Sequence, residues 1–428
     1  MQRTSTNRKT KMFLSGLFIA AVCMKLLAAY YMGNGFHPKV WEYEEISTNI
    51  INGKGFLNLW DLEPIKRFNI HFRSLQEPFF PILCAAVYFL TNHSIFAMLM
   101  LQIFYTSLIP IVLFYISYRI YDLKTAISTG VFSLFLPGIT FYSAVNLHHM
   151  PLYSLFFCLM LLFALKLADD NRLRNQLLLG VIFGVGFLIR STTLAIMVFT
   201  FLWLWFLLKI EIKKKAMLLL RILALAVIIV SPWVIRNYYV HKKFVLFQTS
   251  DALCLYMATN PNATGTLFLP DKRFQLEGIP KEVLAKYDSM TEIQFRDLMK
   301  EEAWKYIKQD PLRIAGLSLR RCLYFWWFSP FSGRAPGFEY PERYIKLYKM
   351  YYFALLGIFL WQLGFVIRNI FKKNNPYARK EVLIMFFLLA AMLPHIILYP
   401  EGRHRFAIEP LLLIFVSRRI IMWGRMLL

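Results

Sequence analysis

The stretch Ser231-Pro-Trp-Val-Ile-Arg-Asn-Tyr238 lies where a long apolar run ends, and Asn260-Pro-Asn-Ala-Thr-Gly265 follows it. An arginine and an asparagine shortly after Pro-Trp at a helix end are polar groups held at a membrane surface. The residues from 241 to about 346 form the one sizeable polar block of the sequence. We therefore expect the functional groups on one face of a membrane, where this block meets embedded helices.

The composition predicts a membrane protein. Of its 428 residues, 58% are hydrophobic, whereas a soluble domain has about 45–50% apolar residues. A span needs about 20 apolar residues, and in hydrocarbon it must satisfy its own backbone hydrogen bonds, so the spans are helices. We predict an all-α polytopic membrane protein. The centres of its clearest apolar runs are residues 12–32, 95–118, 152–165, 218–230, 351–367 and 382–398.

The charge is strongly basic, with 49 Lys and Arg against 25 Asp and Glu. We assign this excess to cytoplasmic loops, where Lys and Arg orient membrane helices, and expect no nucleic-acid partner. The five cysteines show neither metal-ligand spacing nor a disulfide framework. The basic N-terminus precedes an apolar run without a cleavage-site pattern, which indicates an anchor.

Placing the basic clusters inside gives about ten transmembrane helices with cytoplasmic N- and C-termini. In this threading residues 78–90 cross inward and 95–118 cross outward. The number of crossings keeps every basic cluster inside only if residues 125–145 do not cross. We therefore predict that they form a broken, re-entrant element with its bend near Pro137-Gly138. Irregular backbone at membrane depth must be buried in protein or line a wet cavity.

Three parts are predicted along the chain. Residues 1–240 form an N-terminal transmembrane catalytic module with its first outer loop at 33–77, and residues 347–428 form C-terminal transmembrane helices. Residues 241–346 form a small mixed α/β extracytoplasmic domain. Its expected elements are a candidate strand at 244–247, an amphipathic helix at 291–309 and an interfacial segment at 313–328.

Local motifs follow one another over nearly the whole chain. In order they are Tyr43-Glu-Glu-Ile-Ser-Thr-Asn-Ile-Ile-Asn-Gly-Lys-Gly-Phe56, Glu77-Pro-Phe-Phe-Pro81, Gly184-Val-Gly-Phe-Leu-Ile-Arg-Ser-Thr-Thr193, Pro232-Trp-Val-Ile-Arg-Asn237, the 260–265 segment, Glu302-Ala-Trp-Lys-Tyr-Ile-Lys-Gln-Asp-Pro311 and Gly402-Arg-His-Arg-Phe-Ala-Ile-Glu-Pro410.

With these motifs the chain resembles bacterial C-type membrane glycosyltransferases, close to the protein O-mannosyltransferase and lipid A aminoarabinose transferase group. The resemblance implies an integral inner-membrane enzyme with its active site at the outer face, below a small outer domain. Such an enzyme moves a hexosyl or pentosyl group from a polyprenyl-phosphate donor to a glycan, lipid, lipopolysaccharide or protein acceptor, with inversion.

The resemblance also implies a catalytic aspartate about four residues before Tyr43, where this chain has Lys39. Glu42 or Glu45 could substitute for it, or could belong to a solvated face of a juxtamembrane helix. Glu77 is the stronger candidate. It matches a glutamate before proline in the aminoarabinose branch, and partial desolvation suits a carboxylate to general-base work. Its alternative role is as an anion at a helix N-terminus.

Cationic groups are expected to receive the departing phosphate. Arg190 ends a predicted span at the outer face, and Arg403 and Arg405 flank His404 in a forked cationic cluster suited to bidentate phosphate contacts. The alternative is that these arginines are interfacial anchors.

Five further residues are expected to line the cavity: Tyr43, His148, His149, Arg236 and Asn237. Arg236 and Asn237 could instead cap their helix. Adjacent histidines on a helix point in different directions, so we expect no shared metal at His148 and His149. The first outer loop has no Asp-x-Asp pattern, and we predict neither a metal nor another cofactor.

Two other functions remain as alternatives. A transporter or lipid flippase would tend to show paired repeats, and we find none. A non-catalytic relative that acts as a binding or assembly subunit is favoured by Lys39 at the aspartate's place.

Overall fold

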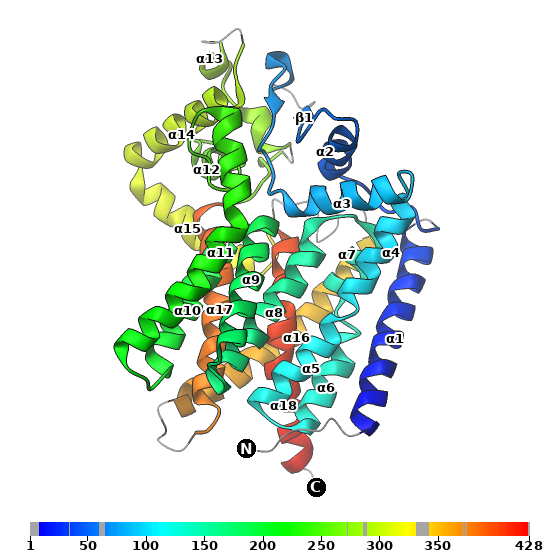
Figure 1. Cartoon of the computed structure of the whole chain (residues 1–428). Helices are drawn as coiled ribbons and strands as arrows, with labels where there is room; N and C mark the ends of the chain where they lie inside the picture. Colours follow the sequence, from blue (N-terminus) through cyan, green and yellow to red (C-terminus); the bar gives the residue numbers. More distant parts are fainter. Residues whose placement is uncertain are drawn as a thin grey trace.

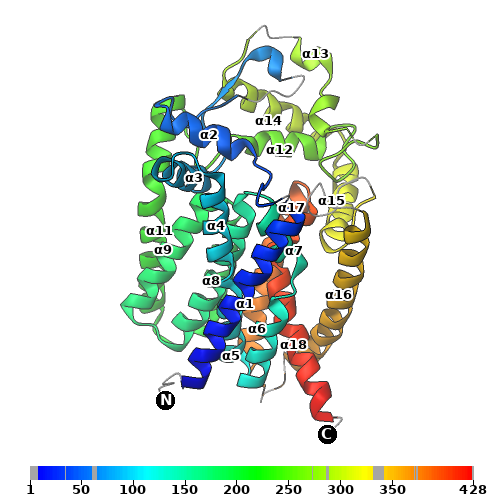
Figure 2. The same ribbon diagram turned by 90° about the vertical axis from the view of Figure 1, so that its right-hand side faces the viewer.

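The computed structural model describes residues 8–33, 35–59, 65–271, 273–285, 289–330, 342–370, 372 and 375–426. Long helices form a bundle, and a cap of shorter elements covers one end of it (Figures 1 and 2). We call this the cap end, because α12 (Ser250–Thr259), α13 (Lys281–Leu284) and α14 (Glu292–Gln309) lie there. Both chain termini lie at the opposite end, which we call the terminal end.

The prediction of a polytopic helical membrane protein is confirmed. In the part of the chain that is described, seven helical stretches are long and apolar enough to cross a membrane. These stretches are Arg8–Met32 (α1), Ile95–Ile120 (α4, Ile95–Thr106, and α5, Ile109–Ile120), Leu123–Val145, His149–Asp169 (α8), Ile212–His241 (α11), Ile345–Asn369 within α16 (Glu342–Ile370), and Ala378–Ile397 (α17). Shorter apolar helices are α3 (Phe79–Leu90), α9 (Leu173–Ile189) and α10 (Thr193–Leu207), and α18 (Glu409–Met426) ends the bundle.

Helix α3 does not cross the bundle, so the threading of residues 78–90 is wrong. Its 12 residues measure about 18 Å at 1.5 Å per residue, well short of a hydrocarbon layer of about 30 Å. Near its start the Pro81 carbonyl accepts a hydrogen bond from Ser47 of α2 (Glu42–Ile51). Just after the end of α3, His93 Nε2 lies 3.4 Å from a carboxylate oxygen of Glu44, which is also in α2. Both ends of α3 are therefore at the cap end (Figure 1).

Residues 123–145 form a crossing that is broken but not re-entrant. Helix α6 (Leu123–Ser133) begins at the terminal end, where Asp122 accepts a 2.9 Å hydrogen bond from Arg418. Helix α7 (Pro137–Val145) ends at the cap end, where Asn146 forms a β-bridge with Lys39. The predicted bend at Pro137 is present, because proline cannot continue the preceding helix. Parity no longer needs a re-entrant element once α3 is taken out of the threading.

The cap combines the first outer loop with the polar block. Strands β1 (Asn58–Leu59) and β2 (His71–Phe72) pair antiparallel with Asn58 opposite Phe72. Apolar residues that flank β2 share a buried cluster with α12 and α14. The strands of the cap thus come from the first loop. Residues 244–247 form no strand, which corrects that expectation.

One arginine of α15 (Pro311–Trp326) fastens the cap to the bundle. Arg321 has 0% exposure. Its guanidinium donates to the carbonyl of Ile397 at 2.8 Å, to that of Ile396 at 3.2 Å, and to that of Ala258. These carbonyls lie at the C-terminal ends of α17 and α12, where helices leave acceptors without intrahelical partners. Arg321 therefore satisfies two helix ends at once.

Replacing Arg321 by methionine should destabilise the protein, because the buried carbonyl of Ala258 and the part-buried carbonyls of Ile396 and Ile397 lose their donor, and an unsatisfied buried group costs about 1–3 kcal/mol. We expect the midpoint of thermal unfolding in detergent to fall by on the order of 5 °C or more. The neighbouring Arg320 is exposed, so Arg320→Met is the matched control and should change the midpoint by less than half as much. Equal shifts for the two variants would contradict this role of Arg321.

Candidate active site

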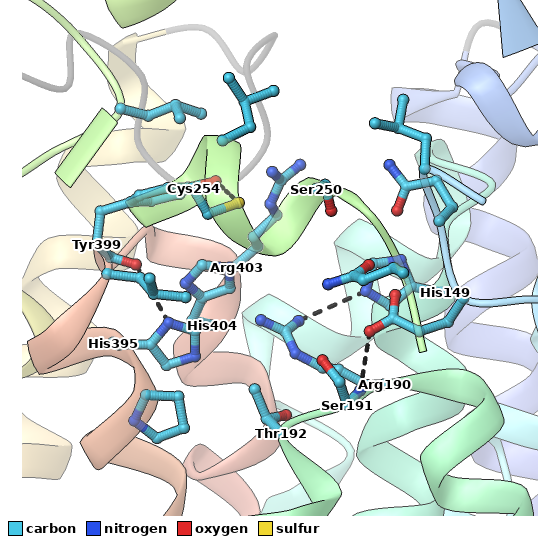
Figure 3. Close-up of a pocket in the computed structure, with 18 of the residues that line it drawn as sticks. His149, Arg190, Ser191, Thr192, Ser250, Cys254, His395, Tyr399, Arg403 and His404 are labelled. Atoms are coloured by element: carbon cyan, nitrogen blue, oxygen red, sulfur yellow. Dashed lines mark hydrogen bonds between the residues drawn. The ribbon is translucent and has the colours of Figure 1, made fainter. Parts of the chain in front are cut away.

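A pocket of about 230 Å³ opens at the cap end, beneath α12 and beside the first loop (Figure 3). It is lined by the N-terminus of α8, the turn between α9 and α10, and the segment between α17 and α18. Seven predicted site residues line it, although they are spread over most of the chain. They are Tyr43, Glu77, His148, His149, Arg190, Arg403 and His404.

Glu77 brings a buried carboxylate into this pocket. It precedes Pro78, the N-cap of α3, and is 7% exposed. Its Oε1 accepts a hydrogen bond of 2.8 Å from the backbone N–H of Ser191. Burial raises the pKa of Glu77, and the Ser191 N–H and the charge of Arg190 offset part of that rise. A carboxylate with a raised pKa that faces a cavity is suited to accept a proton.

Arg190 ends α9 in an extended conformation, with φ −160° and ψ 125°, so its side chain turns into the pocket (Figure 3). Its Nη1 lies 3.5 Å from Nε2 of His149 and contacts the sulfur of Met150. The guanidinium also lies 5.5 Å from the centre of the Tyr153 ring. Among the described residues no ion pair is formed by Arg190. Its charge is available to an anion in the pocket.

Arg403 supplies the second cation, from the 3₁₀ helix η3 (Gly402–Ala407). Its Nε lies 2.5 Å from a carboxylate oxygen of Glu401. Burial disfavours the charged form, but Glu401 and nearby tyrosines raise the pKa of Arg403 above its usual range. The pocket therefore holds two guanidinium groups from separate elements.

The histidines around the pocket form two close pairs. The rings of His148 and His149 are 4.3 Å apart. They lie side by side because His148 is the extended N-cap of α8 rather than a helical residue, so the expectation that they diverge is wrong. Tyr43 Oη lies 2.5 Å from Nδ1 of His149.

His404 stacks on His395 at 3.9 Å, and burial lowers the pKa of His404 and His148 well below the usual range. Burial thus disfavours the charged form of His404, so a neutral imidazole is the form that faces the pocket. Over the described ranges, no three His, Cys, Asp or Glu side chains are arranged to hold a metal ion.

The other two candidate carboxylates do not line the pocket. Glu42 accepts a 2.8 Å hydrogen bond from Gln76, and burial raises its pKa. Glu45 accepts from the side chain of Asn58 at 2.6 Å and from the N–H of Leu59 at 2.9 Å. Glu45 thereby fastens β1 to α2, which is a structural role.

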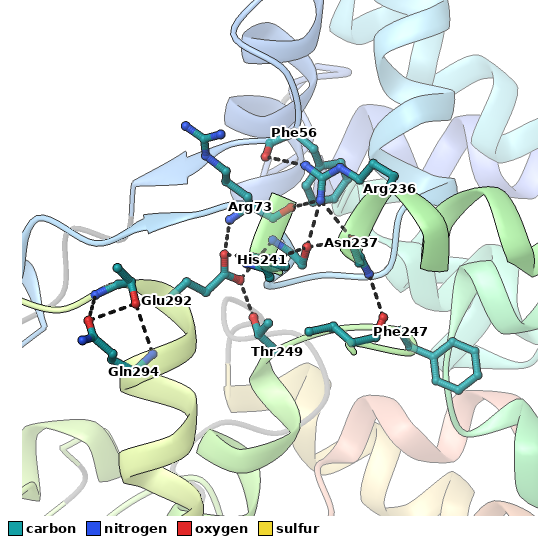
Figure 4. A network of polar contacts seen from close by, with 12 residues as sticks. Phe56, Arg73, Arg236, Asn237, His241, Phe247, Thr249, Glu292 and Gln294 are labelled. Atoms are coloured by element: carbon teal, nitrogen blue, oxygen red, sulfur yellow. Dashed lines mark hydrogen bonds and ion pairs between the residues drawn. The ribbon is translucent and has the colours of Figure 1, made fainter. Parts of the chain in front are cut away.

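Arg405, Arg236 and Asn237 also lie outside the pocket lining. Arg405 is 1% exposed, with its guanidinium 4.2 Å from the centre of the Phe328 ring and 4.6 Å from that of Tyr352. Arg236 and Asn237 join a polar network around Ser74 (Figure 4). Arg403 and Arg405 therefore do not form the predicted fork. Arg236 and Asn237 do not line the cavity, as the sequence predicted that they would.

Several pocket residues were not predicted. Ser191 holds Glu77 through its backbone, which no side-chain pattern could reveal. His395 and Tyr399 line the pocket at the end of α17. The sequence could have indicated these two residues. Both are polar aromatic residues at the outer end of the 382–398 run, and the Gly402-Arg403 motif follows shortly after them.

Residues 76–235 match the family model described as dolichyl-phosphate-mannose-protein mannosyltransferase. No curated protein matches the chain in sequence. The apo oligosaccharyltransferase of Archaeoglobus fulgidus aligns with a TM-score of 0.61 at 12% identity, over 100% of this chain and 52% of that one. The same organism's AglB, in complex with an inhibitory peptide and a dolichol-phosphate, aligns with a TM-score of 0.53 at 11% identity, over 98% and 51%.

ArnT of Cupriavidus metallidurans bound to undecaprenyl phosphate aligns with a TM-score of 0.41 at 12% identity, over 97% of this chain and 79% of that one. This chain spans about half the length of the archaeal oligosaccharyltransferases. The predicted resemblance is confirmed: residues 76–235 match the mannosyltransferase family model, and the chain has the fold of the archaeal oligosaccharyltransferase.

Proposed function

We propose that this protein is a glycosyltransferase that moves one sugar from a polyprenyl-phosphate donor to a hydroxyl group of a lipid, glycan or protein. The observation that carries the proposal is the meeting of Glu77, Arg190 and Arg403 in one pocket at the cap end. The fold supports it, since AglB with this fold was solved with a dolichol-phosphate.

We place the pocket at the extracytoplasmic face of an inner membrane. Basic residues gather at the terminal end, where the first turn of α11 carries Lys213, Lys214 and Lys215. Lysine and arginine mark the cytoplasmic side of membrane helices. The cap and the pocket then face outward, where polyprenyl-linked donors and their acceptors meet.

The proposed reaction is a single displacement. The acceptor oxygen forms a bond to the anomeric carbon from the face opposite the phosphate, which inverts that carbon. The bond between the anomeric carbon and the phosphate oxygen breaks, and its electron pair stays on the phosphate. Glu77 takes the acceptor's proton, while Arg190 and Arg403 offset the growing phosphate charge. The scheme uses no metal ion, because the two arginines supply the positive charge.

The test of the proposal is Glu77→Gln, which keeps the shape of the side chain but cannot accept the proton. We expect transfer of radiolabelled sugar from polyprenyl-phosphate monosaccharides to fall by about 10²-fold or more, as for loss of a general base. Binding of polyprenyl phosphate should change by less than threefold.

The control for this variant is Glu282→Gln, an exposed carboxylate of the cap, which should leave transfer unchanged. Full transfer by the Glu77→Gln protein would remove Glu77 from the mechanism.

The pH dependence should report the raised pKa of Glu77. Glu77 accepts a proton only when ionised, so kcat/KM should fall as the pH is lowered through its raised pKa. That acid limb should lie above the value of about 4.3 for an ordinary glutamate. The residual activity of Glu77→Gln should lack the limb. A wild-type limb at or below about pH 4.3 would argue for a different base.

Arg190→Ala should weaken donor binding by about 10- to 100-fold, because a charge-assisted hydrogen bond to phosphate contributes about 1.5–3 kcal/mol. Arg190→Lys keeps the charge but loses the planar fork, and should fall in between. The measurement is KM for the donor together with the affinity for polyprenyl phosphate. Arg174→Ala at the exposed start of the same helix is the control. An unchanged affinity in Arg190→Ala would exclude Arg190 from the phosphate site.

A further inference from the structure

A second buried carboxylate, that of Glu292, lies beside the exit of the first loop (Figure 4). Glu292, the first residue of α14, is 4% exposed. Its Oε2 accepts from the N–H of Arg73 at 2.6 Å, and its Oε1 accepts from the N–H of Ser74 at 3.0 Å. The hydroxyl of Thr249 donates to the same Oε1. Glu292 thus holds two consecutive backbone amides of the loop and one side chain of the cap.

The other side of this loop segment is held by α11. Arg236 Nη1 donates to the carbonyl of Arg73 at 2.6 Å and to the hydroxyl of Ser74 at 2.9 Å. That hydroxyl donates to Oδ1 of Asn237 at 2.9 Å. The Ser74 carbonyl accepts from the N–H of Thr249 at 2.8 Å. Every polar group of Ser74 is therefore bonded, and Ser74 is fully buried.

Two short chain segments connect the contacts of Glu292 to the pocket. Glu77 follows Ser74 by three residues, a span of at most about 11 Å. Ser250, which follows Thr249, lines the pocket. Glu292 itself does not line the pocket. The Glu292 carboxylate therefore links the segment that carries Glu77 to the start of α12 at Ser250. We call this part of the pocket lining the cap wall.

We propose that Glu292 is a positioning residue of the active site, acting through Ser74 and Thr249 to set where the Glu77 carboxylate lies relative to the cap wall. The inference rests on the proposed function. Arg190 and Arg403 come from other elements, the α9–α10 turn and η3. Loosening the Glu292 contacts should therefore misplace the base without removing the phosphate-binding cations.

Burial of a carboxylate is costly unless hydrogen bonds satisfy it, and burial raises the pKa of Glu292. Three donors converge on this one group. A glutamine has one oxygen and an NH₂ group. In Glu292→Gln the NH₂ group must face a backbone N–H, so at least one of the two amide contacts is lost.

The experiment compares Glu292→Gln with Glu302→Gln in the full-length protein. Glu302 lies on the same helix and is similarly buried at 5% exposure, but it pairs with Lys305 at 3.5 Å and lies outside the network. We expect kcat of Glu292→Gln to fall at least tenfold, while its affinity for polyprenyl phosphate changes by less than threefold. Glu302→Gln should keep kcat within twofold.

Glu292→Asp, which keeps the charge and both acceptor oxygens, should recover at least a third of the lost kcat. A kcat for Glu292→Gln within twofold of wild type would overturn the proposal. So would a parallel loss of kcat, affinity and thermal stability that aspartate does not rescue. If Glu292→Gln does not fold, Ser74→Ala, which spares the backbone contacts, takes its place with the same thresholds for kcat and affinity.

The Glu77→Gln protein separates this inference from the proposed function. If Glu77→Gln loses transfer and Glu292→Gln keeps it, only the positioning role fails. If Glu77→Gln keeps transfer, the proposed mechanism fails, whatever Glu292→Gln does.

Discussion

The hydrogen bond from the Ser191 N–H to the Glu77 carboxylate is the contact on which the site depends. It joins two segments 114 residues apart in the chain. Ser191 follows Arg190, so the bond that holds the carboxylate also places it beside a cation. Pro78 follows Glu77 and starts α3. The same bond therefore helps to keep α3 at the cap end, where the first loop can cover the pocket.

The pocket is built from helix ends, and a membrane protein has a physical reason to place it there. Helix ends carry backbone groups without intrahelical partners, which cannot face hydrocarbon. Here the α8 N-cap is His148, the α9 C-cap is Arg190, and η3 carries Arg403. These three side chains of the pocket lining sit where a regular α-helix stops, at the end of the bundle that the cap covers.

The sequence predicted the helical bundle and the residues whose role depends on their place along the chain. Glu77 and Arg190 adjoin the ends of apolar runs, and such ends can be read from the sequence. The orientation of α3 did not follow from its apolar pattern, because α3 is held at the cap end by contacts of Pro81 and His93 with α2. Arg405 looked equivalent to Arg403, and only the tertiary packing sends its side chain between Phe328 and Tyr352.

Contacts between distant segments were also beyond sequence patterns. Arg236 and Asn237 sit at the end of an apolar run, as a cavity residue would, but their partner is Ser74 of the first loop. Glu292 belongs to an amphipathic helix whose charges looked solvated. Its burial depends on a loop more than 200 residues earlier, at a separation of 218 to Ser74.

Lys39 can be reconciled with a catalytic first loop by the geometry of that loop. The Lys39 backbone donates to the carbonyl of Val145 at 2.8 Å and accepts from the N–H of Leu147 at 2.9 Å. Position 39 thus binds the start of the loop to the segment before α8 through backbone atoms, without use of its side chain. The carboxylate reaches the pocket from the loop's exit instead, at Glu77. Under the proposed mechanism, a loop anchored at both ends can supply its carboxylate from either end, so a lysine at its start does not by itself mark an inactive relative.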